Sequence, residues 1–198
     1  LGMDIWQDDG WTPIDADETQ LARVQKVLQM LHSAGLMRSE SYENVLAAMQ
    51  DKEHYGWRIT TAPGGLTQFS LSDTYAVHEE IEAEDAYRSC PIYLDVTLSY
   101  DDMPLFLNYQ NREESWEDNA AQKNLQSYCA ALGLDNFADW QVLNWPHSAQ
   151  SCGAAAYSET AQVYLVVNYD DGITLSAVSM TPKSFAEFNR VFSKEDGT

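Results

Sequence analysis

The sequence predicts an α+β fold, with a mostly antiparallel sheet, helices on one face of it, and an N-terminal helical hairpin before it. Two observations carry this prediction. Apolar residues follow helical spacing early in the chain, and short alternating segments joined by Asp-, Gly- and Pro-containing turns follow. With 44% hydrophobic residues in 198, the chain can build one core. We therefore expect a single domain over residues 3–198, with the hairpin over 15–52 and the sheet-and-helix body over 55–198.

The predicted hairpin consists of two amphipathic segments. The first covers residues 15–37, where Gly35 is a natural stop and one face carries Leu21, Val24, Val27, Leu28 and Leu31. The second covers residues 39–50, where we expect Ser39 or Ser41 to cap the helix. Its buried stripe would contain Tyr42, Val45, Leu46 and Met49.

Seven strands and two helices are expected after residue 55. The strands pair around turns at Pro63-Gly64-Gly65, Asp101-Asp102 and Asp170-Asp171-Gly172. We expect strands over 57–61, 66–71, 92–100, 105–109, 163–169 and 173–180, with a further one near 140–145 and a loop over 146–158. A helix is expected over 115–132, and Thr181 with Pro182 is a strong start signal for a final helix.

An internal similarity suggests a duplicated unit. Two segments, Ile92 to Asp102 and Val163 to Asp171, each run from an apolar strand into the sequence Tyr-Asp-Asp. Each is followed by a second strand and a helix. If the similarity reflects duplication, it implies two ββα units in one sheet, although hairpin turns favour Asp in any case.

The charge balance is the strongest functional indication. The chain carries 31 acidic against 11 basic residues, a net charge of −20, where roughly 2 to 8 in magnitude suffices for solubility. Such an excess repels itself and destabilises the compact state, so it favours a role with a positively charged partner. It disfavours nucleic acid and anionic lipid, and no apolar run approaches the roughly 20 residues of a membrane span.

No catalytic, metal or cofactor motif stands out. Cys90, Cys129 and Cys152 form neither a disulfide framework nor a CxxC zinc motif, although a Cys129–Cys152 bridge is an alternative in an oxidising compartment. The four histidines are scattered, and His78 among carboxylates is expected to have a raised pKa. Tyr-Asp-Asp resembles polymerase metal ligands, but turn chemistry explains it more simply. We therefore predict no catalytic residues, no metal and no cofactor.

The predicted partner-binding residues combine acidic groups with an aromatic anchor. Carboxylates steer a basic partner from a distance, and exposed Trp or Tyr side chains dominate binding energy at short range. The densest acidic block lies between residues 79 and 85, and Trp116 lies among acidic residues. The predicted set is Glu79, Glu80, Glu82, Glu84, Asp85, Asp101, Asp102, Trp116, Asp170 and Asp171.

The leading hypothesis is a non-enzymatic inhibitor of a basic protein, in concrete form a bacterial immunity protein that neutralises a cognate toxin. A DNA mimic that blocks a nucleic-acid-binding enzyme is an alternative, as is an enzyme with a site of dispersed carboxylates. Acidity as a saline adaptation is a fourth. Leu1 and Gly2 before Met3 are typical of a tag remnant, so we expect a cytoplasmic protein, or a periplasmic one if a leader precedes Met3.

Overall fold

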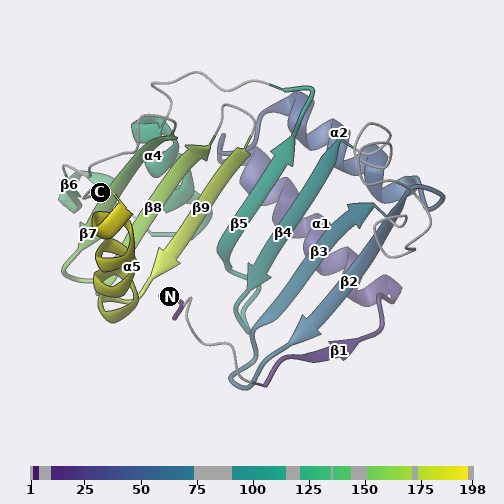
Figure 1. Cartoon of the computed structure of the whole chain (residues 1–198), viewed down its shortest axis with the longest axis horizontal. Coiled ribbons are helices and arrows are strands. Elements are labelled where there is room, and N and C mark those ends of the chain that lie inside the picture. Colours follow the sequence, from purple (N-terminus) through teal and green to yellow (C-terminus); the bar gives the residue numbers. More distant parts are fainter. Residues whose placement is uncertain are drawn as a thin grey trace.

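The computed structural model describes residues 2–4, 10–73, 91–114, 121–134, 136–143, 151–170 and 174–195. Nine strands form one antiparallel sheet in the order β1-β2-β3-β4-β5-β9-β8-β7-β6 (Figure 1). The predicted α+β class is confirmed. The strands are β1 Thr12–Ile14, β2 Tyr55–Thr61, β3 Thr67–Asp73, β4 Ile92–Leu98, β5 Pro104–Asn111, β6 Gln141–Leu143, β7 Ser151–Ser158, β8 Val163–Asp170 and β9 Thr174–Met180.

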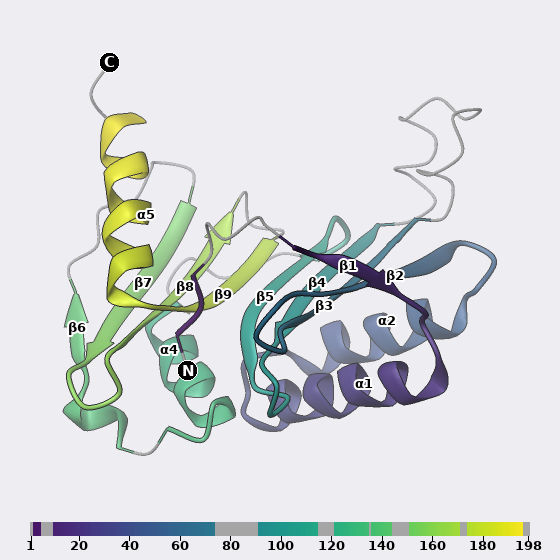
Figure 2. The same cartoon turned by 90° about the horizontal axis from the view of Figure 1, so that it is seen from below.

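Three helices form a layer on one face of the sheet (Figure 2). They are α1 Glu18–Ser33, α2 Ser39–Gln50 and α4 Ala121–Ala131. In α1, the Asp17 side chain accepts a hydrogen bond from the Gln20 backbone N–H at 2.9 Å, and Gly35 follows the helix with φ +80°. The apolar stripe predicted for α1 is buried, apart from half-buried Leu21. Leu125, Tyr128 and Cys129 of α4, and Leu132 just after it, are buried as well.

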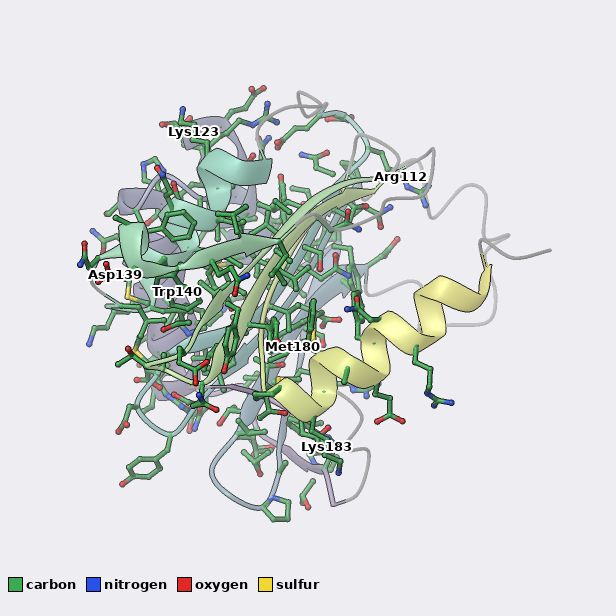
Figure 3. The ribbon with its side chains drawn as sticks, turned by 90° about the vertical axis from the view of Figure 1, so that its left-hand side faces the viewer. Arg112, Lys123, Asp139, Trp140, Met180 and Lys183 are labelled. Carbon is green, nitrogen blue, oxygen red and sulfur yellow. The ribbon has the colours of Figure 1, made fainter. Side chains whose placement is uncertain are left out.

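The fourth described helix, α5 (Pro182–Glu195), lies on the opposite face (Figure 2). Figure 3 shows the same separation, with Lys123 on α4 and Lys183 on α5 on opposite sides of the sheet. The predicted Thr181 cap is present, since its hydroxyl accepts the Ser184 N–H at 3.2 Å. Phe185 from α5 packs into a separate apolar cluster with Ala155, Val166, Val178 and Met180. The expectation that all helices share one face is therefore wrong for α5.

This arrangement does not support two of the finer fold predictions. The helices that follow the two similar strand pairs pack on opposite faces, so a duplicated ββα unit is not confirmed. β1 precedes α1 in the chain and pairs with β2 at residues 59–61. Because α1 and α2 both pack against the sheet core, they are part of its helical layer and not a separate hairpin that precedes the sheet.

The loop expected over 146–158 contains a strand instead. β7 pairs with β8 over its whole length, from Ser151 to Ser158. Its sequence, SCGAAAYS, lacks the β-branched residues that signal a strand. Ala155 and Ala156 are nonetheless fully buried, Ala155 with the α5 cluster and Ala156 with the main core, because small side chains fit a strand covered on both faces.

The expected serine cap of α2 is also wrong. The N-cap position is Arg38, which makes no side-chain capping bond. Ser41 is fully buried, and its hydroxyl donates to the Glu114 carboxylate at 2.5 Å. The Ser41 hydroxyl therefore makes a tertiary contact and does not form the helix cap that the local sequence predicted.

None of the described helices has both the length and the hydropathy that a membrane span requires.

Candidate functional site

The face of the sheet opposite α1, α2 and α4 is polar. Along each central strand, residues that point to the helical layer are buried and apolar, such as Phe69, Leu94 and Leu107. Their neighbours point to the other face because side chains alternate along a strand. Among the described helices only α5 lies on that face, beside β8 and β9, and none of them lies over β2 to β5 (Figure 2).

Six polar side chains lie opposite one another across this face and form what we call the polar row. Register places Arg58 opposite Ser70, Ser70 opposite Asp95, and Asp95 opposite Asn108. Ser176 follows on β9, and Asn168 follows on β8. Cross-strand neighbours have Cβ atoms about 4.5–5.5 Å apart, so each side chain in the row can interact with the next. The polar row is Arg58, Ser70, Asp95, Asn108, Ser176 and Asn168.

Asp95 is the acidic centre of the row. Ser70 donates its hydroxyl hydrogen to Oδ1, and Tyr93, two residues earlier on β4, donates its phenolic hydrogen to Oδ2. Burial raises the pKa of Tyr93 well above its ordinary value, and the hydrogen bond to Asp95 raises it further. Tyr93 therefore stays protonated at neutral pH and fixes the orientation of the carboxylate.

Two carboxamides in the row are incompletely satisfied. The Oδ1 atoms of Asn108 and Asn168 are buried and have no hydrogen-bond partner. Both residues are cross-strand neighbours of Ser176, so they flank it on the same face. A buried acceptor without a donor costs about 1–3 kcal/mol, and such a group in a native structure calls for an explanation.

An aromatic stack borders the row on the α5 side. The Tyr164 ring on β8 lies 4.0 Å from the Phe185 ring of α5, with an interplanar angle of 7°. The centroid of the Tyr157 ring on β7 lies 4.5 Å from the centroid of the Tyr164 ring. Phe106, two residues before Asn108 on β5, packs against the same apolar cluster. The open face thus changes from polar to apolar toward α5.

The predicted partner-binding residues fall into two groups. Asp101 and Asp102 are described, in the turn between β4 and β5; Asp101 is exposed, whereas Asp102 forms an ion pair with Arg23 of α1, with Nη2 2.7 Å from Oδ1. Asp170 is the last residue of β8, and its backbone pairs with Thr174 of β9. The remaining members, Glu79, Glu80, Glu82, Glu84, Asp85, Trp116 and Asp171, lie outside the described residues, as does His78.

The described chain ends beside these segments lie at one end of the sheet. Asp73 at the end of β3 pairs with Tyr55, and Ile92 at the start of β4 pairs with Asn111 at the end of β5. Thr174 at the start of β9 pairs with Gln110 of β5. The turn that contains Asp101 and Asp102 joins β4 to β5 at the other end of these strands. The structure therefore separates these two residues from the strand ends that flank the other predicted partner-binding residues.

Glu114 forms a buried carboxylate cluster that the sequence did not reveal. Its oxygens accept hydrogen bonds from Arg38 (2.8 Å), Ser41 (2.5 Å), Asn44 (3.0 Å), Tyr109 (2.6 Å) and Asn111 (2.8 Å). Burial alone would raise the pKa of Glu114, but these bonds outweigh it and lower the pKa to about 2. Because donors surround the carboxylate, the cluster joins α2 to β5 and offers little room for a ligand.

His54 has a raised pKa. Its Nδ1 lies 2.8 Å from Asp51 Oδ2, and this contact raises the pKa of His54 above its ordinary 6.5. We expect Asp51→Asn to move the pKa back toward 6.5, because it removes the charged acceptor. An NMR titration of the imidazole in both proteins measures this, and identical pKa values would contradict the assigned contact.

Within the described part of the chain, no three His, Cys, Asp or Glu side chains come together in a group that could hold a metal ion. Cys129 is a buried thiol outside any disulfide and donates to the Leu134 carbonyl at 3.1 Å, so it does not form the alternative bridge to Cys152. Comparison of the chain with protein-family models, curated proteins and solved structures gave no match.

Sequence reasoning missed the polar row, although its signal was present. β3 and β4 alternate strictly, with Ser70 and Asp95 between buried apolar residues. Such alternation predicts a half-exposed sheet. It does not indicate that six strands align their polar positions in one row, because register between distant strands is a property of the folded sheet.

Proposed function

We propose that the protein is an acidic, non-enzymatic binding protein that inhibits a basic protein partner. In its concrete form it is an immunity protein that neutralises a cognate toxin with a basic active site. The observation that carries the proposal is a sheet face lined with polar side chains in a chain of net charge −20. Charge complementarity of this kind accelerates encounter with a basic surface and selects against acidic ones.

The chemistry of the polar row favours recognition over covalent catalysis. Ser70 and Tyr93 both donate their hydrogens to Asp95, so both hydroxyls are held as donors. The raised pKa of Tyr93 opposes its use as a base at neutral pH. A surface with fixed donors and acceptors can instead bind a complementary protein.

An exposed aromatic side chain supports the same proposal. Tyr100 in the β4–β5 turn is 81% exposed and precedes Asp101. A Tyr beside carboxylates combines the short-range anchor with the long-range attraction that binding a basic protein requires. Tyr100 thus has the properties of the aromatic anchor that the sequence predicted at Trp116.

The test is affinity capture from the source organism at about 0.05 M and about 0.5 M salt, followed by purification of the captured protein and measurement of its Kd. We expect one basic protein whose affinity falls as salt rises, and inhibition of its activity by the acidic protein. Capture of many nucleic-acid-binding proteins would support DNA mimicry instead. Capture of no specific protein at low salt would contradict the proposed function.

A further inference from the structure

The geometry points to the polar row as a binding site for an arginine-bearing segment of the partner, with the guanidinium group seated on the cross-strand pair Asp95 and Asn108. Asn168 lies three strands from Asp95 and is left to another N–H of the same segment. This inference rests on the proposed function, because it specifies where and through which chemistry the basic partner is bound. It places the contact on the sheet face and not only in the acidic segments that the sequence singled out.

Asp95 supplies the charged acceptor. An ionised carboxylate has about four lone-pair positions, and the Ser70 and Tyr93 hydroxyls fill one on each oxygen. The remaining positions can accept the parallel N–H bonds of a guanidinium group, which are stronger than neutral hydrogen bonds. The two hydroxyls keep the carboxylate in a fixed orientation, so little side-chain freedom is lost on binding.

Asn108 and Asn168 supply further acceptors. Their Oδ1 atoms are buried without a donor in the free protein, so each carboxamide is stabilised if a partner provides an N–H. Because Oδ1 is buried, a carboxamide of the row accepts from a bound group only after a half-turn about its last bond, which exchanges its oxygen and its nitrogen. A binding surface carries such unsatisfied acceptors in the free protein because the partner completes their hydrogen bonds in the complex.

Several features favour arginine over lysine. Guanidinium carries five N–H donors in one plane, which suits acceptors spread along a row, whereas an ammonium group is a compact point charge. Half-buried Phe106 lies two residues before Asn108 on the same face and offers a ring on which a guanidinium or its stem can pack. The net charge of −20 favours cations at any surface position.

Arg58 sets the direction of binding. It is exposed on β2, at the end of the row beyond Ser70. Its positive charge repels a second guanidinium on the β2 side of Asp95. The incoming group is therefore placed on the β5 side of Asp95, where Asn108 lies and where the described residues of the row carry no positive charge.

The test is an NMR titration of the full chain with N-acetyl-arginine amide, with N-acetyl-citrulline amide as the uncharged control of nearly the same shape. We expect the side-chain amide signals of Asn108 to shift with arginine, with a Kd on the order of millimolar. Those of Asn168, three strands from Asp95, should shift less. Citrulline should shift them much less. Shifts spread over exposed carboxylates, or equal shifts with both probes, would overturn the inference.

Two variants and one control make the test specific. Asp95→Asn should weaken the arginine response about tenfold or more, because it removes the charged acceptor. Asn108→Val should also weaken it, yet raise the thermal midpoint, because it replaces an unsatisfied acceptor by a better strand former. Glu43→Gln, at an exposed position of α2 on the other face of the sheet, should change neither result. An arginine response that persists in Asp95→Asn overturns the site.

The same variants separate the inference from the proposed function. If the captured basic partner binds Asp95→Asn and Asn108→Val as tightly as the unaltered protein, the function stands and the polar row is not the site. If arginine amide binds the row and no basic partner is captured, the row is a cation site and the inhibitor function fails.

Discussion

Glu114→Gln is expected to lower the free energy of unfolding by roughly 3 kcal/mol at neutral pH. The Glu114 side chain is 3% exposed and accepts hydrogen bonds from five side chains on α2, β5 and its adjoining turn. Glutamine has nearly the same shape but loses the charge that pairs with Arg38. One of its terminal atoms also becomes a donor, which faces Ser41, Asn44 or other donors in a buried cluster.

The matched control for this variant is the neighbouring residue. Glu113 is exposed, and only its backbone N–H is engaged, with the Asn111 side chain at 3.0 Å. Glu113→Gln removes the same charge from the same turn and should change stability by less than about 0.5 kcal/mol. Urea unfolding of both variants measures the difference. Equal stability of the two would show that the Glu114 cluster is not a stabilising contact.

The effect of Glu114→Gln should depend on pH in a defined direction. The pKa of Glu114 in the folded protein is about 2, below its ordinary value of 4.5. A lowered pKa means that the stabilisation is complete above pH 4.5 and is lost as the pH falls toward 2. The difference in unfolding free energy between the two proteins should therefore shrink below pH 4.5. A difference that is constant from pH 7 to pH 3 would contradict the assigned pKa.

Local signals in the sequence predicted much of the fold. The stop of α1 and the start of α5 depend on residues within a few positions of each helix end, namely Gly35 and Thr181. The strands β2 to β5, β8 and β9 combine alternation or apolar runs with turns at their ends. These features are decided by neighbours in the chain, so the sequence contains them directly.

Features that depend on distant residues could not be predicted in this way. β7 is a strand because α4 and the α5 cluster cover its two faces, which makes small residues acceptable there. β1 and β6 have three residues each, too few for a periodic pattern. The face that α5 selects depends on Tyr164 and Val166 of β8, which form an apolar patch only after the strands are paired.

The candidate site shows the same division. Acidic and aromatic content predicted the kind of partner, but it directed attention to dense charge in the sequence, such as Glu79 to Asp85. In the polar row a single carboxylate, Asp95, carries the negative charge among the six residues. Its neighbours come from five strands, and only register places them together. Similarly, Asp102 is as acidic as Asp101 in sequence, yet Arg23 engages it in the folded protein.

Tyr164→Ala is expected to lower the free energy of unfolding by about 3 kcal/mol and to loosen α5 more than the rest of the protein. The Tyr164 ring lies between Tyr157 and Phe185, at 4.5 Å and 4.0 Å. Phe185 is 6% exposed and belongs to the cluster that holds α5 to β8 and β9. Because α5 rises away from the sheet from this contact (Figure 2), loss of the ring removes its main support.

Hydrogen exchange distinguishes this local effect from general destabilisation. Amides of α5 should lose protection in Tyr164→Ala to a greater extent than amides of α1, whose core contacts are with the other face of the sheet. Tyr164→Phe keeps the ring and should preserve both stability and protection to within about 0.5 kcal/mol. If α5 and α1 lose protection equally, α5 unfolds only with the whole domain. If α5 alone is loosened, it is a separately mobile border of the polar row, and Tyr164 then links the stability of α5 to the shape of the binding face.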